Sequence, residues 1–294
     1  MIDFLVIGVQ KSATSWLYTC LKEHPEVILP DRKREVEYIG GPRYNKEGGI
    51  TWYYGLFGRN NTAGKKIGDV SVEYFYSEES PFEIQKHLPD CKFILLLRNP
   101  TERFQSAYFW YLRKGLIDQT LNIKTQILKA ISSNSDDEEL GIVRDLLGRG
   151  YYEQQLDNYL ACFDPTHFHV VFFEYISQNP QKALSAIYSF IGVERNFTPQ
   201  SIGSRPKRNS YNSLLILIER LGGKNKIVSK VADVTNQFLA RVLKNQVKEK
   251  VFDQGITSAL NSHYKEMNSG LAAKLLKLSD GKKHSDSVSR YWNW

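Results

Sequence analysis

The chain has 294 residues and lacks any apolar run near the roughly 20 residues that a helix needs to cross a bilayer. It also lacks clustered cysteines: Cys20, Cys91 and Cys162 are isolated, odd in number and set in apolar surroundings. Reduced core thiols are therefore expected rather than disulfides or a metal site, and no metal is expected elsewhere. The first apolar run begins at Phe4, leaving no room for a leader peptide, so we expect a soluble cytoplasmic protein.

The chain has no zinc spacing, aromatic RNA-binding signature or recognition-helix pattern, although lysine and arginine give it a formal net charge of +7. The basic residues are scattered along the sequence. We therefore expect no nucleic-acid partner. The positive field favours a small polyanionic ligand instead.

A basic, hydroxyl-rich turn follows the first apolar run, residues 4–8. Residues 16–21 after the turn place Trp, Leu, Cys and Leu at helical spacing, so the turn joins a buried strand to an amphipathic helix. Unpaired amides and the positive end of the helix dipole favour an anion there. The same turn contributes one lysine and three hydroxyls: Lys11, Ser12, Thr14 and Ser15. The sequence thus predicts a phosphate or sulfate site.

The turn is not the Walker A loop of an ATPase or GTPase. That loop places its lysine directly after a second glycine. Here Gly8 is followed five residues later by Ala13, and Lys11 lies inside the loop. A nucleotide kinase or NTPase is therefore disfavoured but stays open as an alternative.

A second strand, turn and helix is expected around Arg98. Residues 92–97 are an apolar run, Asn99 is a candidate helix cap, and Pro100 suits a first helical turn. Arg98 and Ser106 stand eight residues apart. A guanidinium offers forked donors to a phosphate, and a hydroxyl adds a neutral hydrogen bond.

The two segments together resemble the sulfotransferases that use 3′-phosphoadenosine 5′-phosphosulfate (PAPS). That family has K-[ST]-[GA]-T-[ST]-x-L after its first strand and R-[DN]-P-x-x-R-x-x-S-x-[YW] at its 3′-phosphate site. The chain also resembles the heparan-sulfate type and its bacterial relatives in five further segments: His24–Val27, Arg34–Ile39, Gly49–Tyr53, Arg149–Leu160 and Val170–Tyr175. The chain departs from the family at Val70 and Val72, where a lysine that contacts the leaving phosphate and a proline are common.

The resemblance implies PAPS as the cofactor, no metal, and a set of site residues. Lys11 would act in catalysis, and Glu35 would be the general base, with Glu37 as its substitute. The implied cofactor-binding residues include a late basic loop: Lys11, Ser12, Ala13, Thr14, Ser15, Trp16, Arg98, Ser106, Tyr151, Lys207 and Arg208.

The expected fold is α/β, with a central parallel sheet flanked by helices, a P-loop NTPase-like sulfotransferase fold. Four apolar runs alternate with helical stretches: residues 4–8, 67–72, 93–98 and 169–174. We expect one domain over residues 1–294, mainly helical beyond about residue 210. Two local predictions are a capping box at Ser80 to Glu83 and a core stripe made of Tyr264, Met267, Leu271, Leu275 and Leu276.

The predicted function is transfer of a sulfuryl group from PAPS to a hydroxyl, or a nitrogen, of a small-molecule acceptor such as a secondary metabolite. A saccharide or glycolipid acceptor is the alternative. More distant alternatives are the kinase or NTPase and a non-catalytic nucleotide-binding protein. No membrane span is expected, and the oligomeric state is left open.

Overall fold

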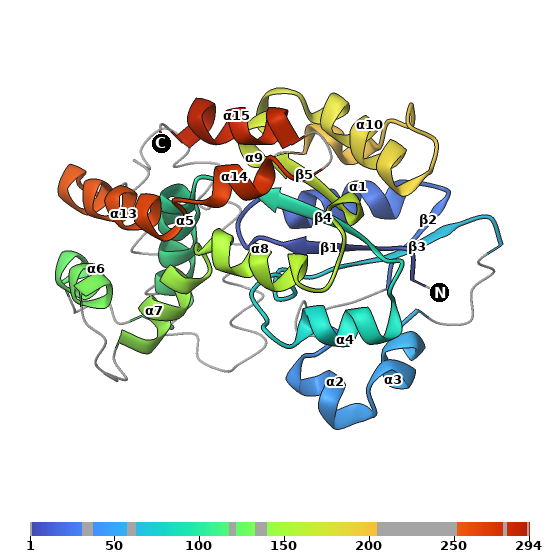
Figure 1. The fold of residues 1–294 in the computed structure, drawn as a ribbon, viewed down its shortest axis with the longest axis horizontal. Coiled ribbons are helices and arrows are strands. Elements are labelled where there is room, and N and C mark those ends of the chain that lie inside the picture. Colours follow the sequence, from blue (N-terminus) through green and yellow to red (C-terminus); the bar gives the residue numbers. More distant parts are fainter. Residues whose placement is uncertain are drawn as a thin grey trace, which may run out of the picture. The chain divides into compact units, whose positions relative to one another are not determined.

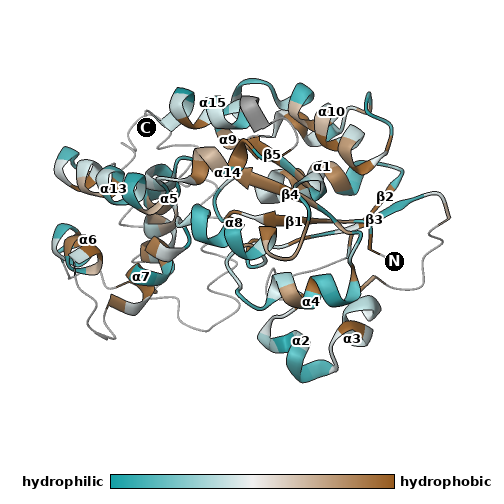
Figure 2. Ribbon diagram, viewed as in Figure 1, coloured by the Kyte–Doolittle hydropathy of each residue, from teal (hydrophilic) through white to brown (hydrophobic). Residues whose placement is uncertain are grey.

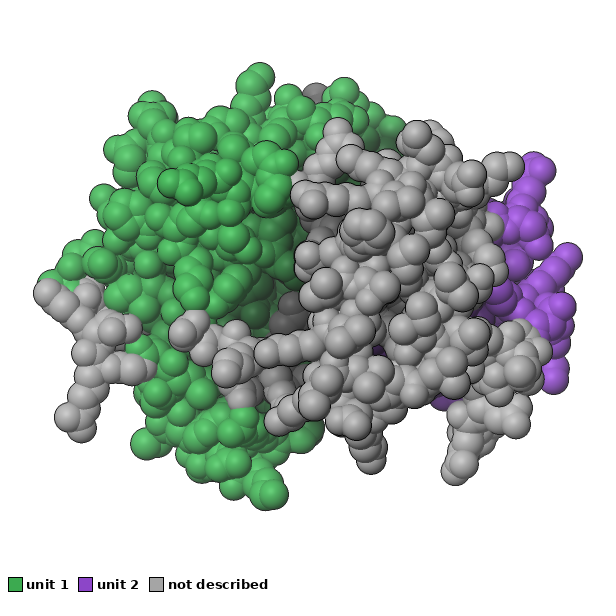
Figure 3. Space-filling view, turned by 180° about the vertical axis from the view of Figure 1, so that it is seen from behind, with its two compact units in different colours: residues 1–103, 149–206, 264–294 green, residues 104–148, 207–263 purple. Residues whose placement is uncertain are grey.

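The computed structural model describes residues 2–30, 38–57, 63–117, 122–132, 140–204, 252–278, 281–292 and 294. The chain divides into two compact units, coloured separately in Figure 3. Unit 1 contains residues 1–103, 149–206 and 264–294, and unit 2 contains residues 104–148 and 207–263. The single sulfotransferase domain expected over residues 1–294 stays a prediction.

Unit 1 is built on a five-stranded sheet in the order β2-β3-β1-β4-β5, in which every strand pair is parallel (Figure 1). The strands are β1 (Phe4–Gly8), β2 (Val27–Ile28), β3 (Lys66–Val70), β4 (Lys92–Leu97) and β5 (Phe168–Phe172). Because parallel strands end at the same edge, the turns after β1 and β4 emerge side by side. The predicted parallel α/β fold is confirmed.

Alternate residues of the strands enter two separate hydrophobic clusters, one on each face of the sheet. Leu5 and Leu95 belong to the first cluster, and Val6 and Leu96 belong to the second. Strands β1 and β4 are largely brown, that is hydrophobic, in Figure 2. A sheet covered on both faces needs apolar side chains at consecutive positions, which explains the unbroken apolar runs of the sequence.

The helices of unit 1 cover both faces of the sheet (Figure 1). The second cluster includes residues of α1 (Thr14–Glu23) and α10 (Pro180–Ile191). Residues of α4 (Ser80–His87), α8 (Tyr152–Leu160), α14 (Leu271–Leu275) and α15 (Gly281–Trp292) enter the first. The remaining short helices are α2 (Pro42–Glu47), α3 (Ile50–Gly55), α9 (Phe173–Gln178), η2 (Pro165–His167) and η3 (Gln200–Gly203).

The described part of unit 2 is helical. It holds α6 (Ile123–Ser132), α7 (Gly141–Gly148), most of α5 (Pro100–Arg113) and most of α13 (Gln254–Met267). Tyr108 donates its hydroxyl to Gln126 Oε1 at 2.8 Å, and Phe252 packs against Phe109 with ring centroids 5.2 Å apart. Across the described residues of both units, no helix has the length and apolarity to cross a membrane.

Two local predictions need correction. Ser80 is not a capping residue, because its hydroxyl donates to the Ile39 carbonyl at 2.7 Å, while the Glu83 amide bonds the Glu79 carbonyl. The predicted core stripe is only partly right: Tyr264, Leu271 and Leu275 are buried, but Met267 and Leu276 are exposed. The stripe fails because α13 ends at Met267 and α14 begins only at Leu271, so the residues do not share one helix face.

Candidate active site

The turn after β1 is shaped by left-handed backbone. Gly8 has φ 142°, and two residues with side chains, Lys11 and Ala13, each have φ 70°. Helix α1 starts directly after Ala13, and the Leu17 amide bonds the Ala13 carbonyl at 3.0 Å. The amides of the first helical turn have no acceptor within the helix. Successive amides in such a turn form a concave anion-binding surface.

The hydroxyls of this turn differ in exposure. Ser12 is fully buried, and its Oγ has no hydrogen-bond partner among the residues that the structure describes. Thr14 is buried as well, whereas Ser15 is exposed. A buried hydroxyl without a partner is costly, so this arrangement fits an anion that would accept its hydrogen bond.

The turn after β4 is capped as the sequence predicts. Asn99 Oδ1 accepts from the amides of Thr101 and Glu102 at 3.0 and 3.2 Å, and α5 begins at Pro100. The Asn99 amide in turn donates to Glu174 Oε1 at 2.9 Å. These bonds fix the backbone on the C-terminal side of Arg98.

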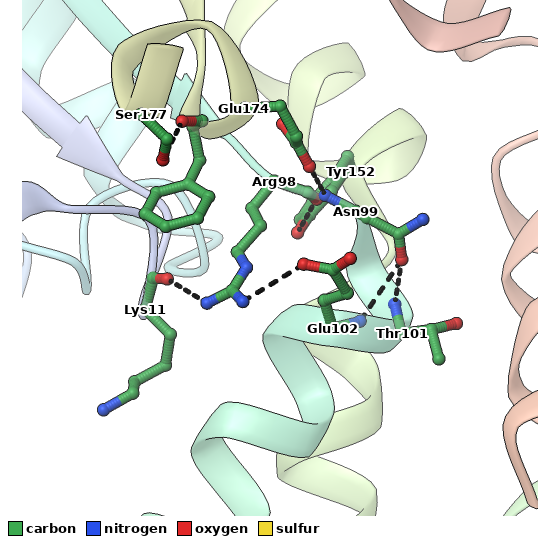
Figure 4. A network of polar contacts seen from close by, with 9 residues as sticks. Lys11, Arg98, Asn99, Thr101, Glu102, Tyr152, Glu174 and Ser177 are labelled. Carbon is green, nitrogen blue, oxygen red and sulfur yellow. Dashed lines mark hydrogen bonds and ion pairs between the residues drawn. The ribbon is translucent and has the colours of Figure 1, made fainter. Parts of the chain in front are cut away.

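The Arg98 side chain joins the two turns (Figure 4). Its Nη1 donates to the Lys11 carbonyl at 3.1 Å, and its Nη2 forms an ion pair with Glu102 Oε2 at 3.1 Å. The guanidinium carbon lies 4.4 Å from the centroid of the Phe173 ring. Its Nε finds no partner within the described part of the chain. Lys11 and Arg98, predicted to serve opposite ends of one ligand, thus belong to one network.

Glu174 is a second carboxylate of this network. Burial raises its pKa above the ordinary value, and its Oε2 is buried with no partner in the described ranges. Desolvation of the charged form is the larger effect, and the bond from the Asn99 amide acts against it.

Tyr151 and Tyr152 lie at the start of α8, and Tyr152 contacts the site. The fully buried Tyr152 donates its hydroxyl to the Arg98 carbonyl at 3.0 Å. Tyr151, a predicted cofactor residue, is partly buried, and this burial raises its pKa. Just before them, Arg149 makes a forked ion pair with Glu73, at 3.1 and 2.9 Å, beside the end of β3.

The other predicted site residues have different outcomes. Trp16 is buried, and its indole N–H donates to the Ile202 carbonyl at 3.3 Å. Ser106 lies on α5 within unit 2, so its pairing with Arg98 stays a prediction. Four predicted residues lie outside the described residues: Glu35, Glu37, Lys207 and Arg208.

Sequence reasoning missed three residues that surround Arg98. Glu102 stands four residues after Arg98 on the following helix, a spacing that favours an ion pair and was available in the sequence. Phe173 and Glu174 directly follow β5, and strand-end position was the only signal for them. Their contact with Arg98 and Asn99 arises from the pairing of β4 with β5.

The parallel sheet, the left-handed turn at a helix start and the adjoining arginine define an α/β protein with a P-loop-like anion-binding site. The family model of the sulfotransferase domain matches residues 1–214, and the chain belongs to this sulfotransferase family. The predicted family is confirmed, and with it the sulfotransferase class of the enzyme.

The chain is similar to two bifunctional heparan sulfate N-deacetylase/N-sulfotransferases. It is 28% identical to number 4 of Mus musculus over 235 residues, which cover 77% of this chain and 26% of that protein. It is also 28% identical to number 1 of Homo sapiens over 236 residues, covering 77% and 25%. The chain therefore spans about a quarter of the length of these relatives.

Among solved structures, the chain is similar to a sulfotransferase from Alicyclobacillus acidocaldarius. The TM-score is 0.57 at 23% sequence identity, with 76% of this chain and 90% of that chain covered. This likeness supports the fold, and the predicted P-loop-like sulfotransferase fold is confirmed.

Proposed function

We propose that this chain transfers a sulfuryl group from PAPS to a hydroxyl or amino nitrogen of an acceptor and leaves 3′,5′-bisphosphoadenosine. The bond from the Arg98 guanidinium to the Lys11 carbonyl carries the proposal. It supports a ligand with an anionic group at each end, because it joins a backbone anion site to a phosphate-matched side chain.

The residues of the chain fit this cofactor. Main-chain amides of the turn after β1, with the hydroxyls of Ser12, Thr14 and Ser15, would hold the 5′ end. Arg98 and Ser106 would hold the 3′-phosphate, with Trp16, Tyr151, Lys207 and Arg208 as further candidate contacts. When bound, PAPS supplies the activated sulfuryl group.

Two side chains would perform the chemistry. The Lys11 ammonium would balance the negative charge that develops on the leaving group, because positioned cations stabilise such charge strongly in a desolvated site. Glu35 would take the proton from the acceptor, with Glu37 as the alternative base. The acceptor oxygen or nitrogen would bond to sulfur as the bond from sulfur to the 5′-phosphate oxygen breaks, with no covalent bond to the enzyme, so positioning and electrostatics would account for the reaction.

Two classes of acceptor, a saccharide and a small molecule, fit the chain about equally. The relatives act on heparan sulfate according to their names, which supports a saccharide acceptor. The small-molecule acceptor expected from the sequence has the same reacting groups, a hydroxyl or an amine, and stays a prediction.

Binding is the first test. Isothermal titration of the purified full chain would compare 3′,5′-bisphosphoadenosine, 5′-AMP and ATP. We expect the bisphosphate to bind most tightly, by about tenfold or more over 5′-AMP, since an added charged hydrogen bond contributes about 1.5–3 kcal/mol. Tighter binding of ATP would instead support a kinase or NTPase, and equal binding of all three would overturn the proposal.

Turnover is the second test. PAPS would be incubated with N-unsubstituted and N-acetylated glucosamine oligosaccharides and with a panel of phenols and aliphatic alcohols, and sulfated products would be detected by mass spectrometry. Glu35→Gln should abolish product while leaving bisphosphate binding intact, with Glu37→Gln as the matched control. Loss of product in Glu37→Gln alone would transfer the role of base to Glu37, and binding without any turnover would favour a non-catalytic nucleotide-binding protein.

A further inference from the structure

The turn that begins α8, residues 150–153, is tied to the candidate site at one side. Tyr151 is a predicted cofactor contact, and the Tyr152 hydroxyl holds the carbonyl of Arg98 at 3.0 Å. The position of this turn therefore bears on the backbone from which the Arg98 guanidinium extends.

At its other side the turn is held by Asn268, which lies between α13 and α14 and is 3% exposed. Its Nδ2 donates to the carbonyls of Gly150 and Tyr264, at 3.0 and 2.9 Å. Its Oδ1 accepts from the Glu153 amide at 3.1 Å. An asparagine amide offers two donors and an acceptor. Asn268 donates to the first residue of the turn, Gly150, and accepts from the last, Glu153, while its other donor bond holds the Tyr264 carbonyl near the end of α13.

Packing around Asn268 leaves the turn little freedom. A Cβ added at Gly150 would lie 2.5 Å from a ring carbon of the buried Tyr264, so only glycine allows the ring this close. The Gly270 amide donates to Glu153 Oε2 at 2.6 Å. The Lys274 ammonium also forms an ion pair with Glu153, with 3.6 Å between Nζ and Oε1.

We propose that Asn268 is a positioning residue for the cofactor site: it fixes the turn at residues 150–153 so that Tyr152 holds the Arg98 backbone and its guanidinium stays against the Lys11 carbonyl. The inference rests on the proposed function. Asn268 lies beyond residue 214, where the match to the sulfotransferase domain ends, so the later part of the chain contributes to the same site.

A purely structural role and a positioning role differ in what they do to ligand preference. Loss of stability alone lowers the folded fraction and affects all ligands of the folded state alike. Displacement of Arg98 affects the ligand that carries a 3′-phosphate and spares one that lacks it. The ratio of the affinities for 3′,5′-bisphosphoadenosine and 5′-AMP therefore separates the two roles.

The experiment titrates both nucleotides into the full chain, in the wild type and in Asn268→Ala, Tyr152→Phe and the double variant. We expect Asn268→Ala to lower the affinity ratio about tenfold, which corresponds to roughly one misplaced hydrogen bond. Tyr152→Phe should lower the affinity ratio similarly. The double variant should lower it no further than either single variant, because both residues act through the position of the Arg98 backbone. Lys274→Met removes the side-chain ion pairs of Lys274 with Glu153 and Asp157 but none of the bonds that Asn268 makes to the backbone of the turn, so it should leave the ratio unchanged.

If the alanine variant does not fold, Asn268→Asp replaces it in the experiment. Aspartate keeps the acceptor for the Glu153 amide, but its carboxylate cannot donate to the carbonyls of Gly150 and Tyr264. An unchanged ratio in the folded Asn268 variant, even with a lower unfolding temperature, would overturn the inference, as would additive losses in the double variant. A wild type with no preference for the bisphosphate would instead overturn the proposed function, and with it this inference, before any variant is compared.

Discussion

The turns after β1 and β4 are adjacent and both join a strand to a helix, yet they are built in opposite ways. The first turn presents main chain: Lys11 and Ala13 in left-handed conformation, the start of α1, and the buried Ser12 hydroxyl. The second presents one guanidinium, Arg98, whose backbone is fixed by the Asn99 cap.

The difference teaches where each kind of recognition is vulnerable. A site made of amides persists when a side chain is changed, because the backbone conformation supplies the donors. A site made of one arginine depends on that residue and on the groups that orient it. Four substitutions test this contrast, from the largest expected effect to the smallest.

Lys11→Ala should lower kcat about 100-fold while the dissociation constant of 3′,5′-bisphosphoadenosine changes by less than about threefold. Removal of one preorganised charge-stabilising donor typically costs this much in kcat. The main-chain part of the turn keeps the nucleotide bound. Initial rates with PAPS and titration calorimetry measure the two quantities, and an equal loss in both would show that the lysine, not the backbone, binds the nucleotide.

Arg98→Ala should weaken binding of 3′,5′-bisphosphoadenosine about thirtyfold and that of 5′-AMP only slightly. A hydrogen bond to a charged group contributes about 1.5–3 kcal/mol, and only the bisphosphate has the 3′ group. Arg98→Lys is the matched control. It keeps the charge but not the forked donors, so we expect it to restore only part of the affinity. Full restoration by lysine would argue against forked recognition.

Glu102→Gln should strengthen binding of the bisphosphate about twofold. Glu102 competes for Nη2 of Arg98, but its side chain is 56% exposed, and ion pairs of this kind contribute well under about 1 kcal/mol. Titration at low and high salt measures the effect, which should shrink as salt rises. A weaker affinity in the variant would mean that Glu102 orients the arginine more than it competes for it.

Glu174→Gln should change how stability depends on pH. Burial raises the folded-state pKa of Glu174, so the folded state favours its protonated form. The stability from this carboxyl is complete below its ordinary pKa of 4.5 and is lost as pH rises through the raised value. Glutamine keeps the acceptor for the Asn99 amide and does not titrate, so the variant should gain stability relative to wild type as pH rises. Urea unfolding at several pH values measures this, and parallel profiles for the two proteins would contradict it.

The sequence predicted both turns because their signals are local. An apolar run marks each strand, and the Asn99 and Pro100 pair marks the start of α5. It could not predict Asn268, which binds Gly150 across 118 positions of the chain. The capping box at Ser80 failed for the same kind of reason, since the Ser80 hydroxyl donates its hydrogen bond to the carbonyl of Ile39, 41 positions away. Local patterns specify strand ends and caps, whereas partners brought together by packing carry no local signal.

The bond between Arg98 and the Lys11 carbonyl couples ligand binding at one turn to ligand binding at the other. A ligand that orders one turn lowers the cost of ordering the other, and linkage requires the gain to be the same in both directions. Two separate anions, one for each turn, should then favour each other's binding despite their like charge. Affinity for a molecule with both groups would exceed what its two halves contribute alone.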